Sequence, residues 1–307
     1  MQEERNINYS DEVSISQIIS IILKKKTFIL VFTAIAAIGS VFYSLSLRNI
    51  YTSSAILATS QESESISSAL ASYSALVDMA GINLSSPVEN RSYEALERIK
   101  SLDFFSYYFL PNINLQDIFA VDSWDQKSNT LKYNEKLFDS SKNNWIRKVN
   151  FPLQKIPSNQ EAYEHYKNIL SINEDKKTGF VKLSISHPSP YIAKEWTDII
   201  ILQINESMKE IDKKESINSI NFIEEQLETT KLAELRNALS KMLEKQIQVL
   251  MLTSASEGYV FKVISSPVAP ERKSKPSRAL ICILGTFFGF IFSTFYSIFT
   301  FFYYKKA

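Results

Sequence analysis

The sequence predicts an α+β protein in which two apolar terminal helices flank a mixed base that carries a protruding helical hairpin. Two observations support this fold class. Residues 27–47 and 279–304 contain no charged residue, and each is long enough to cross a bilayer core, which takes about 20 apolar residues. Residues 191–257 contain neither glycine nor proline and repeat apolar side chains at helical spacing. The polar residues 48–278 therefore form a loop with both ends at one membrane face.

Composition narrows the class of protein further. The 307-residue chain has a net charge of +1, which gives no argument for nucleic-acid binding because that usually needs a basic face. The single cysteine, Cys282, lies in the second apolar stretch and excludes an intramolecular disulfide. Only six glycines occur, which favours helices over a turn-rich β fold.

Basic residues next to the apolar stretches predict the topology. Three lysines precede the first stretch and Lys305 and Lys306 follow the second, so the positive-inside rule places 1–26 and 305–307 in the cytoplasm. Basic residues also lie just before the second stretch, but loops of this length translocate largely regardless of charge. A cleaved signal peptide is the alternative for residues 27–47. Its apolar region would usually be about 7–15 residues after a short leader, which does not match this sequence.

The first part of the chain alternates helix and strand signals. Residues 11–23 are amphipathic, and we expect an interfacial helix there rather than a cytoplasmic docking helix. Residues 51–58 predict a strand, and 66–80 and 89–110 predict helices. Residues 111–150 are rich in Asn, Asp, Ser and Lys, so we expect a surface excursion with little regular structure.

The middle of the chain has clearer boundaries. Ser158 and Glu161 form a capping box at the start of a helix predicted over 158–172. Apolar and polar residues alternate over 180–186, which predicts a half-buried strand. We expect this strand to form one membrane-proximal sheet with 51–58 and 259–264, covered by the earlier helices.

The glycine-free stretch 191–257 predicts a hairpin rather than one rod. A single helix would be about 100 Å long, whereas residues 258–278 reach back about 70 Å at most when extended. We therefore predict a turn near 229–231 and an ascending arm about 60 Å long. The protrusion, at about 190–257, contains a heptad-like seam in its second arm. That seam consists of Leu232, Leu235, Leu239, Met242, Gln246 and Val249.

The sequence lacks motifs that are typical of nucleotide-binding, metal-binding and catalytic sites. Neither a phosphate-binding glycine loop nor a dinucleotide fingerprint occurs. The two histidines, His165 and His187, have no cysteine near them in sequence, which argues against a metal site. We expect no catalytic residue, no cofactor and no metal. Trp124, Trp145 and Trp196 could stack on sugars, although core or loop anchoring is the simpler interpretation.

Two features near the second apolar stretch are candidate structural or interaction sites. Pro267, Pro270 and Pro276 stiffen the connector that leads into this stretch. Gly285 and Gly289 are four residues apart, a spacing that permits close packing of membrane helices. The alternative is that both glycines face lipid by chance.

The chain as a whole resembles the Wzz-type chain-length determinants, or polysaccharide co-polymerases. The resemblance depends on three segments in order: DEVSISQIISIILKKKTFILVFTAIAAIGSVFYSLSLRNIYTSSAILA, ISHPSPYIAKEWTDIIILQIN, and KLAELRNALSKMLEKQIQVLML followed by YVFKVISSPVAPERKSKPSRALICILG. It implies an inner-membrane protein with a periplasmic chain-length-determinant domain over 48–278 and a homo-oligomeric ring. It also implies a non-enzymatic role in setting the length of O-antigen of lipopolysaccharide or a related glycan.

The resemblance further implies a membrane polysaccharide polymerase as partner, acting on undecaprenyl-linked glycan. Larger relatives append a cytoplasmic tyrosine kinase, which we expect to be absent because three residues follow the second apolar stretch. The alternative function is a subunit of a capsule or exopolysaccharide export complex that works with a separate kinase. A two-span signalling receptor fits less well, because the tails offer no output domain.

Overall fold

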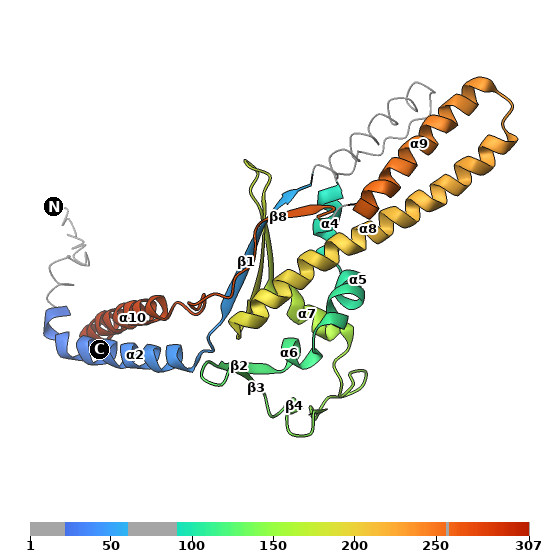
Figure 1. Cartoon of the computed structure of the whole chain (residues 1–307). Helices are drawn as coiled ribbons and strands as arrows, with labels where there is room; N and C mark the ends of the chain where they lie inside the picture. The colour runs from blue at the N-terminus through green and yellow to red at the C-terminus, as the bar shows by residue number, and fades with distance from the viewer. Residues whose placement is uncertain (1–21, 61–90, 256–257, 307) are drawn as a thin grey trace, which may run out of the picture. The chain divides into compact units, whose positions relative to one another are not determined.

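The computed structural model describes residues 22–60, 91–255 and 258–306 (Figure 1). It confirms an α+β fold with two apolar terminal helices and a long helical hairpin. The chain divides into two compact units, one made of residues 1–49 and 274–307 and the other of residues 50–273. The helices predicted over 66–80 and over most of 11–23 lie outside the described residues.

The first unit is a pair of helices, α2 (Lys26–Ser46) and α10 (Arg278–Lys306), which lie side by side (Figure 1). Among the described residues, these two helices are long and apolar enough to cross a membrane. Large apolar side chains such as Leu30 and Phe295 point outward, at 70% and 71% exposure. Lys25 Nζ donates a hydrogen bond to Thr300 Oγ1 at 2.8 Å. The pair thus presents an apolar outer surface of the kind that lipid would cover.

The second unit contains a four-stranded antiparallel sheet with the order β6–β7–β1–β8. The strands are β1 (Tyr51–Thr59), β6 (Leu170–Glu174), β7 (Val181–His187) and β8 (Phe261–Ser265). The three predicted strands therefore share one sheet. The fourth strand was missed, because the helix predicted over 158–172 ends at Ile169 and the chain continues as β6.

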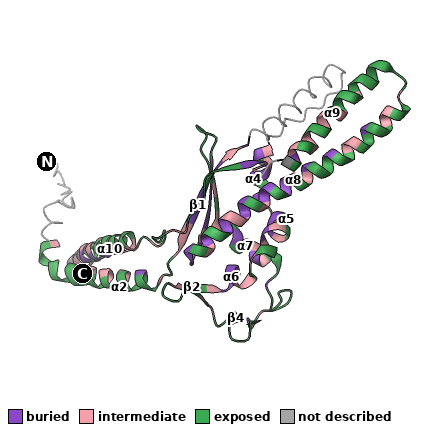
Figure 2. Cartoon of the chain, viewed as in Figure 1, coloured by how far each residue is buried: buried purple, intermediate pink, exposed green. Residues whose placement is uncertain are grey.

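The hairpin consists of α8 (Pro190–Thr229) and α9 (Ala233–Ala255), which pack against each other (Figure 1). The turn occupies residues 230–232, so the predicted hairpin is confirmed. The first half of α8 buries one stripe of side chains against β1 and β7: Trp196, Ile200, Ile204 and Met208. Further out, both arms are largely exposed (Figure 2). The foot of the hairpin is therefore part of the core, whereas further out the contacts seen among the described residues are mainly those between α8 and α9.

Short elements make up the chain from α4 to α7, and several of them contribute side chains to the core beside α8. The helix predicted over 89–110 is broken, because Ser101 Oγ accepts a hydrogen bond from Phe104 N and starts a new helix. The expectation of little regular structure over 111–150 is wrong. This region contains a short helix and two β-hairpins. The elements are α4 (Arg91–Ile99), α5 (Leu102–Phe104), a π-helical turn (Phe105–Phe109), a 3-10 turn (Leu110–Asn112), α6 (Leu115–Phe119), β2 (Val121–Asp125), β3 (Thr130–Tyr133), β4 (Phe138–Asp139) and β5 (Asn144–Trp145).

Helix α7 (Asn159–Ile169) starts at the predicted capping box. Ser158 Oγ accepts from the Glu161 amide, and the Glu161 carboxylate accepts from the Ser158 amide at 3.0 Å. The buried Arg147 donates to both oxygens of the same carboxylate, at 2.6 and 2.9 Å. These bonds fix the loop before α7 to the start of the helix.

The Glu161–Arg147 pair makes stability depend on pH. Hydrogen bonds from Arg147 lower the pKa of Glu161 from 4.5 to about 2. Because the pKa is lower in the folded state, the stabilisation is complete above pH 4.5 and is lost as the pH falls through about 2. We expect Glu161→Gln to lower the free energy of unfolding by about 2 kcal/mol at neutral pH. The difference from wild type should shrink on acidification, as measured by denaturant unfolding in detergent.

Glu164→Gln is the matched control, because Glu164 pairs with Lys167 on an exposed part of the same helix. This pair should contribute only about 0–1 kcal/mol. An equal loss for both variants, or a Glu161→Gln difference that stays constant down to pH 2, would contradict the assignment.

Candidate functional site

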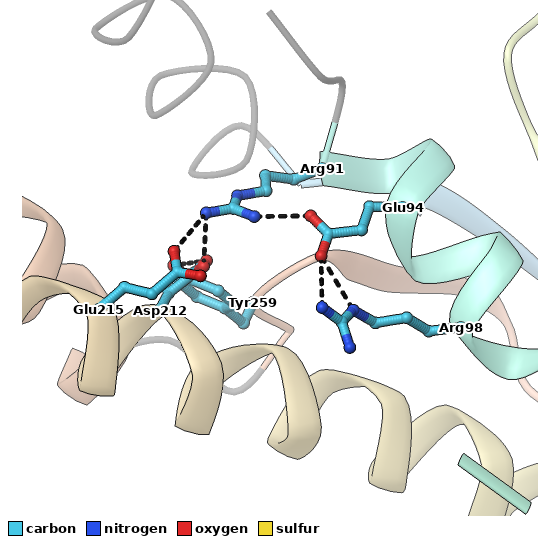
Figure 3. A network of polar contacts seen from close by, with 6 residues as sticks. All are labelled: Arg91, Glu94, Arg98, Asp212, Glu215 and Tyr259. Carbon is cyan, nitrogen blue, oxygen red and sulfur yellow. Dashed lines mark hydrogen bonds and ion pairs between the residues drawn. The ribbon is translucent and has the colours of Figure 1, made fainter. Parts of the chain in front are cut away.

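A polar network lies where the hairpin meets the base (Figure 3). The Arg91 guanidinium contacts Asp212 at 2.8 Å, Glu94 at 2.6 Å and Glu215 at 3.2 Å. Tyr259 Oη donates to Asp212 Oδ2 at 2.7 Å, and only 1% of the Asp212 side chain is exposed. Helix α4, helix α8 and the segment entering β8 thus converge on one buried carboxylate.

The electrostatics of this network favour an orienting role. Burial raises the pKa of Asp212, and the neighbouring Arg91 opposes this shift without cancelling it. Burial and the Asp212 carboxylate raise the pKa of Tyr259, so the phenol stays protonated and donates its hydrogen bond. Removing one partner of such a buried pair is strongly destabilising, because it leaves the other charge uncompensated. The network therefore fixes how the hairpin joins the base.

Asn205 provides a second connection between α8 and β8. Its side-chain amide donates to the carbonyl of Phe261 at 3.1 Å, and its Oδ1 accepts from the amides of Val260 and Phe261 at 2.9 and 3.0 Å. Asn205 is 4% exposed, so water does not replace these bonds. The returning chain is thereby held against the foot of the hairpin as β8 begins.

Sequence reasoning missed these residues. Asn205 is a polar residue beside an apolar helical stripe, and Asp212 is a polar residue at the end of that stripe. Their positions relative to the apolar residues therefore marked both as candidates for buried polar contacts. The sequence gives no comparable sign for Arg91, because an arginine at the start of a helix is usually exposed to solvent.

The sequence-predicted glycines lie on the face of α10 that packs against α2. A Cβ added to Gly285 would lie 2.4 Å from Ser40 Cβ, and one added to Gly289 would lie 2.4 Å from Ala36 Cβ. Small residues four apart on both helices allow this approach. Close helix packing remains the role that we predict for the two glycines.

The sequence-predicted prolines are distributed along the connector. Pro267 is buried, and the adjacent Val268 carbonyl accepts a hydrogen bond from Ser53 Oγ at 2.9 Å. Pro270 and Pro276 are half-buried. The hydrogen bond ties the beginning of the connector to β1, and the stiffening role of the prolines remains a prediction.

The tryptophans and histidines have different environments. Trp196 is buried in the core and packs against His187 and Phe109. Trp145 packs against aromatic side chains from α6 and β4. Among the residues that the structure describes, no three His, Cys, Asp or Glu side chains form a group that could hold a metal ion.

The outer part of the hairpin exposes large apolar side chains. We call this set the hairpin stripe; it comprises Phe222 (61% exposed), Leu232 (71%), Leu235 (48%) and Met242 (38%). Leu232, Leu235 and Met242 belong to the predicted seam of the second arm, so pairing with α8 leaves the seam partly uncovered. An uncovered apolar stripe on a soluble rod is typical of an interaction surface.

Comparisons with known proteins identify related sequences and folds. The family model described as "Chain length determinant protein", Wzz, matches residues 11–99, which confirms the resemblance seen in the sequence. A full-length bacterial polysaccharide co-polymerase is 12% identical with a TM-score of 0.39, and the alignment covers 93% of this chain and 96% of that one. A fragment of WzzB, a polysaccharide co-polymerase from Salmonella Typhimurium, is 14% identical with a TM-score of 0.30, covering 74% of this chain and 100% of that one. The search of curated proteins finds no match.

Proposed function

We propose that this protein is a non-enzymatic polysaccharide co-polymerase that sets the length of O-antigen or a related surface glycan. The observation that carries the proposal is the Wzz match over residues 11–99, which includes α2, β1 and α4. The expected partner is the membrane polymerase that extends undecaprenyl-linked glycan. In this role the protein regulates a reaction that another protein catalyses.

The proposed setting is the inner membrane, with both termini in the cytoplasm and residues 48–278 in the periplasm. The two apolar helices and the lysines at their outer ends support this topology. Strands β1 and β8 are neighbours in the sheet. Because β1 follows α2 and β8 precedes α10 in the chain, their adjacency supports this topology as well. The base and hairpin would project from one membrane face.

The proposed working form is a homo-oligomer that packs through the hairpin stripe. Covering apolar surface contributes about 25 cal/mol per Å², and the exposed side chains on both arms provide such surface in every copy. A ring or cluster of rods would hold polymerase and growing chain together for many additions. This scaffold role agrees with the absence of a catalytic signature in the sequence.

The test is deletion of the gene followed by gel analysis of the surface polysaccharide. We expect the modal banding to disappear and wild-type protein to restore it. The double variant Leu232→Ser, Leu235→Ser should not restore it, and in mild detergent it should run as smaller species, because the stripe loses the exposed Leu232 of the turn and the exposed Leu235 of α9.

The control variant is Glu224→Gln, Glu225→Gln, which changes two exposed polar residues on the facing arm. It should restore banding and assemble normally. Unchanged banding after deletion would refute the proposed function. Unchanged banding together with loss of capsule would instead favour the export function.

A further inference from the structure

Three aromatic side chains from different elements meet at the start of the base. Trp124 of β2 packs edge to face against Tyr51 of β1, with ring centroids 5.7 Å apart, and against Tyr191 of α8 at 6.1 Å. Trp124 Nε1 donates to Asn129 Oδ1 at 2.9 Å. We call Tyr51, Trp124 and Tyr191 the aromatic corner. Tyr191 is 55% exposed and Trp124 is half-buried, so the cluster lies at the surface.

The corner lies at the end of the base opposite the hairpin turn. Tyr191 is the second residue of α8, whereas the turn follows Thr229 at the far end of the same helix. The strands β2 and β3 lie beside the start of α8 (Figure 1). The corner is therefore far from the outer part of the hairpin.

Covalent connection limits how far the corner can lie from α2. Tyr51 follows Ser46, the last residue of α2, by five residues. Five extended residues span at most about 17 Å. If α2 crosses a bilayer, the Tyr51 backbone lies within that distance of the helix end, and Trp124 lies beside Tyr51. The lipid headgroup layer begins where such a helix leaves the hydrocarbon core.

We propose that the aromatic corner contacts the lipid headgroup layer and holds the base against the membrane surface. The proposal rests on the membrane anchoring included in the proposed function. Tyrosine and tryptophan suit this layer because each combines an apolar ring with a polar tip. A sugar-binding platform is less favoured, because edge-to-face packing makes a compact cluster rather than an open flat face.

The sequence offers a clean spectroscopic test, because its three tryptophans all lie in the base and neither apolar helix contains one. The protein is reconstituted into vesicles of phosphatidylcholine brominated on the acyl chains near the ester end. Bromine quenches only nearby indoles. The variant Trp145→Phe retains Trp124 and the buried Trp196, and the double variant Trp124→Phe, Trp145→Phe retains Trp196 alone.

We expect the tryptophan fluorescence of Trp145→Phe to be strongly quenched in brominated vesicles relative to unbrominated vesicles. The double variant should lose most of this quenching. Both proteins carry the same change at position 145, and Trp196 emission reports that the core is intact. Equal quenching of the two variants would overturn the proposal. So would a lack of quenching combined with an emission shift on adding soluble polysaccharide, which would assign the corner to sugar.

The outcome is separate from that of the proposed function. Quenching reports contact with lipid and does not depend on a polymerase, whereas the gel reports glycan length. Quenching of Trp124 with unchanged banding in the deletion strain would retain the membrane contact and reject length control. Loss of the modal banding after deletion, without quenching of Trp124, would retain length control and reject the membrane contact.

Discussion

Asn205→Ala should destabilise the base by about 3 kcal/mol, because it leaves buried backbone groups without partners. The asparagine side chain accepts from two amides and donates to the Phe261 carbonyl at the entry to β8. Alanine supplies none of these bonds, and the site is too buried for water to replace them. We expect a lower midpoint in denaturant unfolding of the detergent-solubilised protein, followed by circular dichroism.

The matched control is Asn168→Ala. Asn168 also lies on a helix and donates to the carbonyl four residues earlier, but it is exposed, so its loss should change stability by about 0.5 kcal/mol or less. An Asn205→Ala protein as stable as the Asn168→Ala protein would show that the returning chain is held by strand pairing alone.

Gly289→Leu should separate α2 from α10 and cost about 3 kcal/mol or more, because overpacking a tight interface forces the helices apart. Even a single added Cβ would lie 2.4 Å from Ala36 Cβ. Leucine adds three further carbons at the same place. The expected result is loss of helix structure at a lower fraction of sodium dodecyl sulfate in mixed micelles.

Gly39→Leu provides the control within the same pair of helices. Apart from the neighbouring backbone of α2 itself, no atom lies within 4 Å of a Cβ built at Gly39, so a side chain there points away from the packed face. Its unfolding midpoint should stay close to that of wild type. Equal sensitivity of the two variants would assign the effect to glycine replacement in general rather than to the contact with Ala36.

Strong periodic signals predicted the large elements correctly. The apolar stripe from Trp196 to Met208 is buried as its spacing indicates, and the hairpin turns where chain reach requires. Strand β6 was missed because Leu170–Glu174 follows a well-capped helix without glycine or proline, so local spacing marks no boundary. Pairing with β7 determines its conformation, and this tertiary contact overrides the local preference.

The short hairpins of 111–150 were missed for a related reason. Asn129 adopts a positive φ of 51° between β2 and β3, and Asp125 Oδ1 accepts from the Lys127 amide at 2.9 Å. These are side-chain turn signals that composition alone reads as loop. The buried network had a weaker signal still, because the partners Arg91 and Asp212 are far apart in sequence and the contact between them exists only after folding.

The hairpin is an insertion between β7 and β8, and the apolar stripe of α8 that is buried in the core, from Trp196 to Met208, lies in the first half of the helix. Removing one heptad from each outer arm would shorten the rod by about 10 Å while preserving which faces meet. The strand register, the Asn205 bonds and the Arg91–Asp212 contact would remain as they are. The length of the hairpin can therefore change without a change in how the base folds.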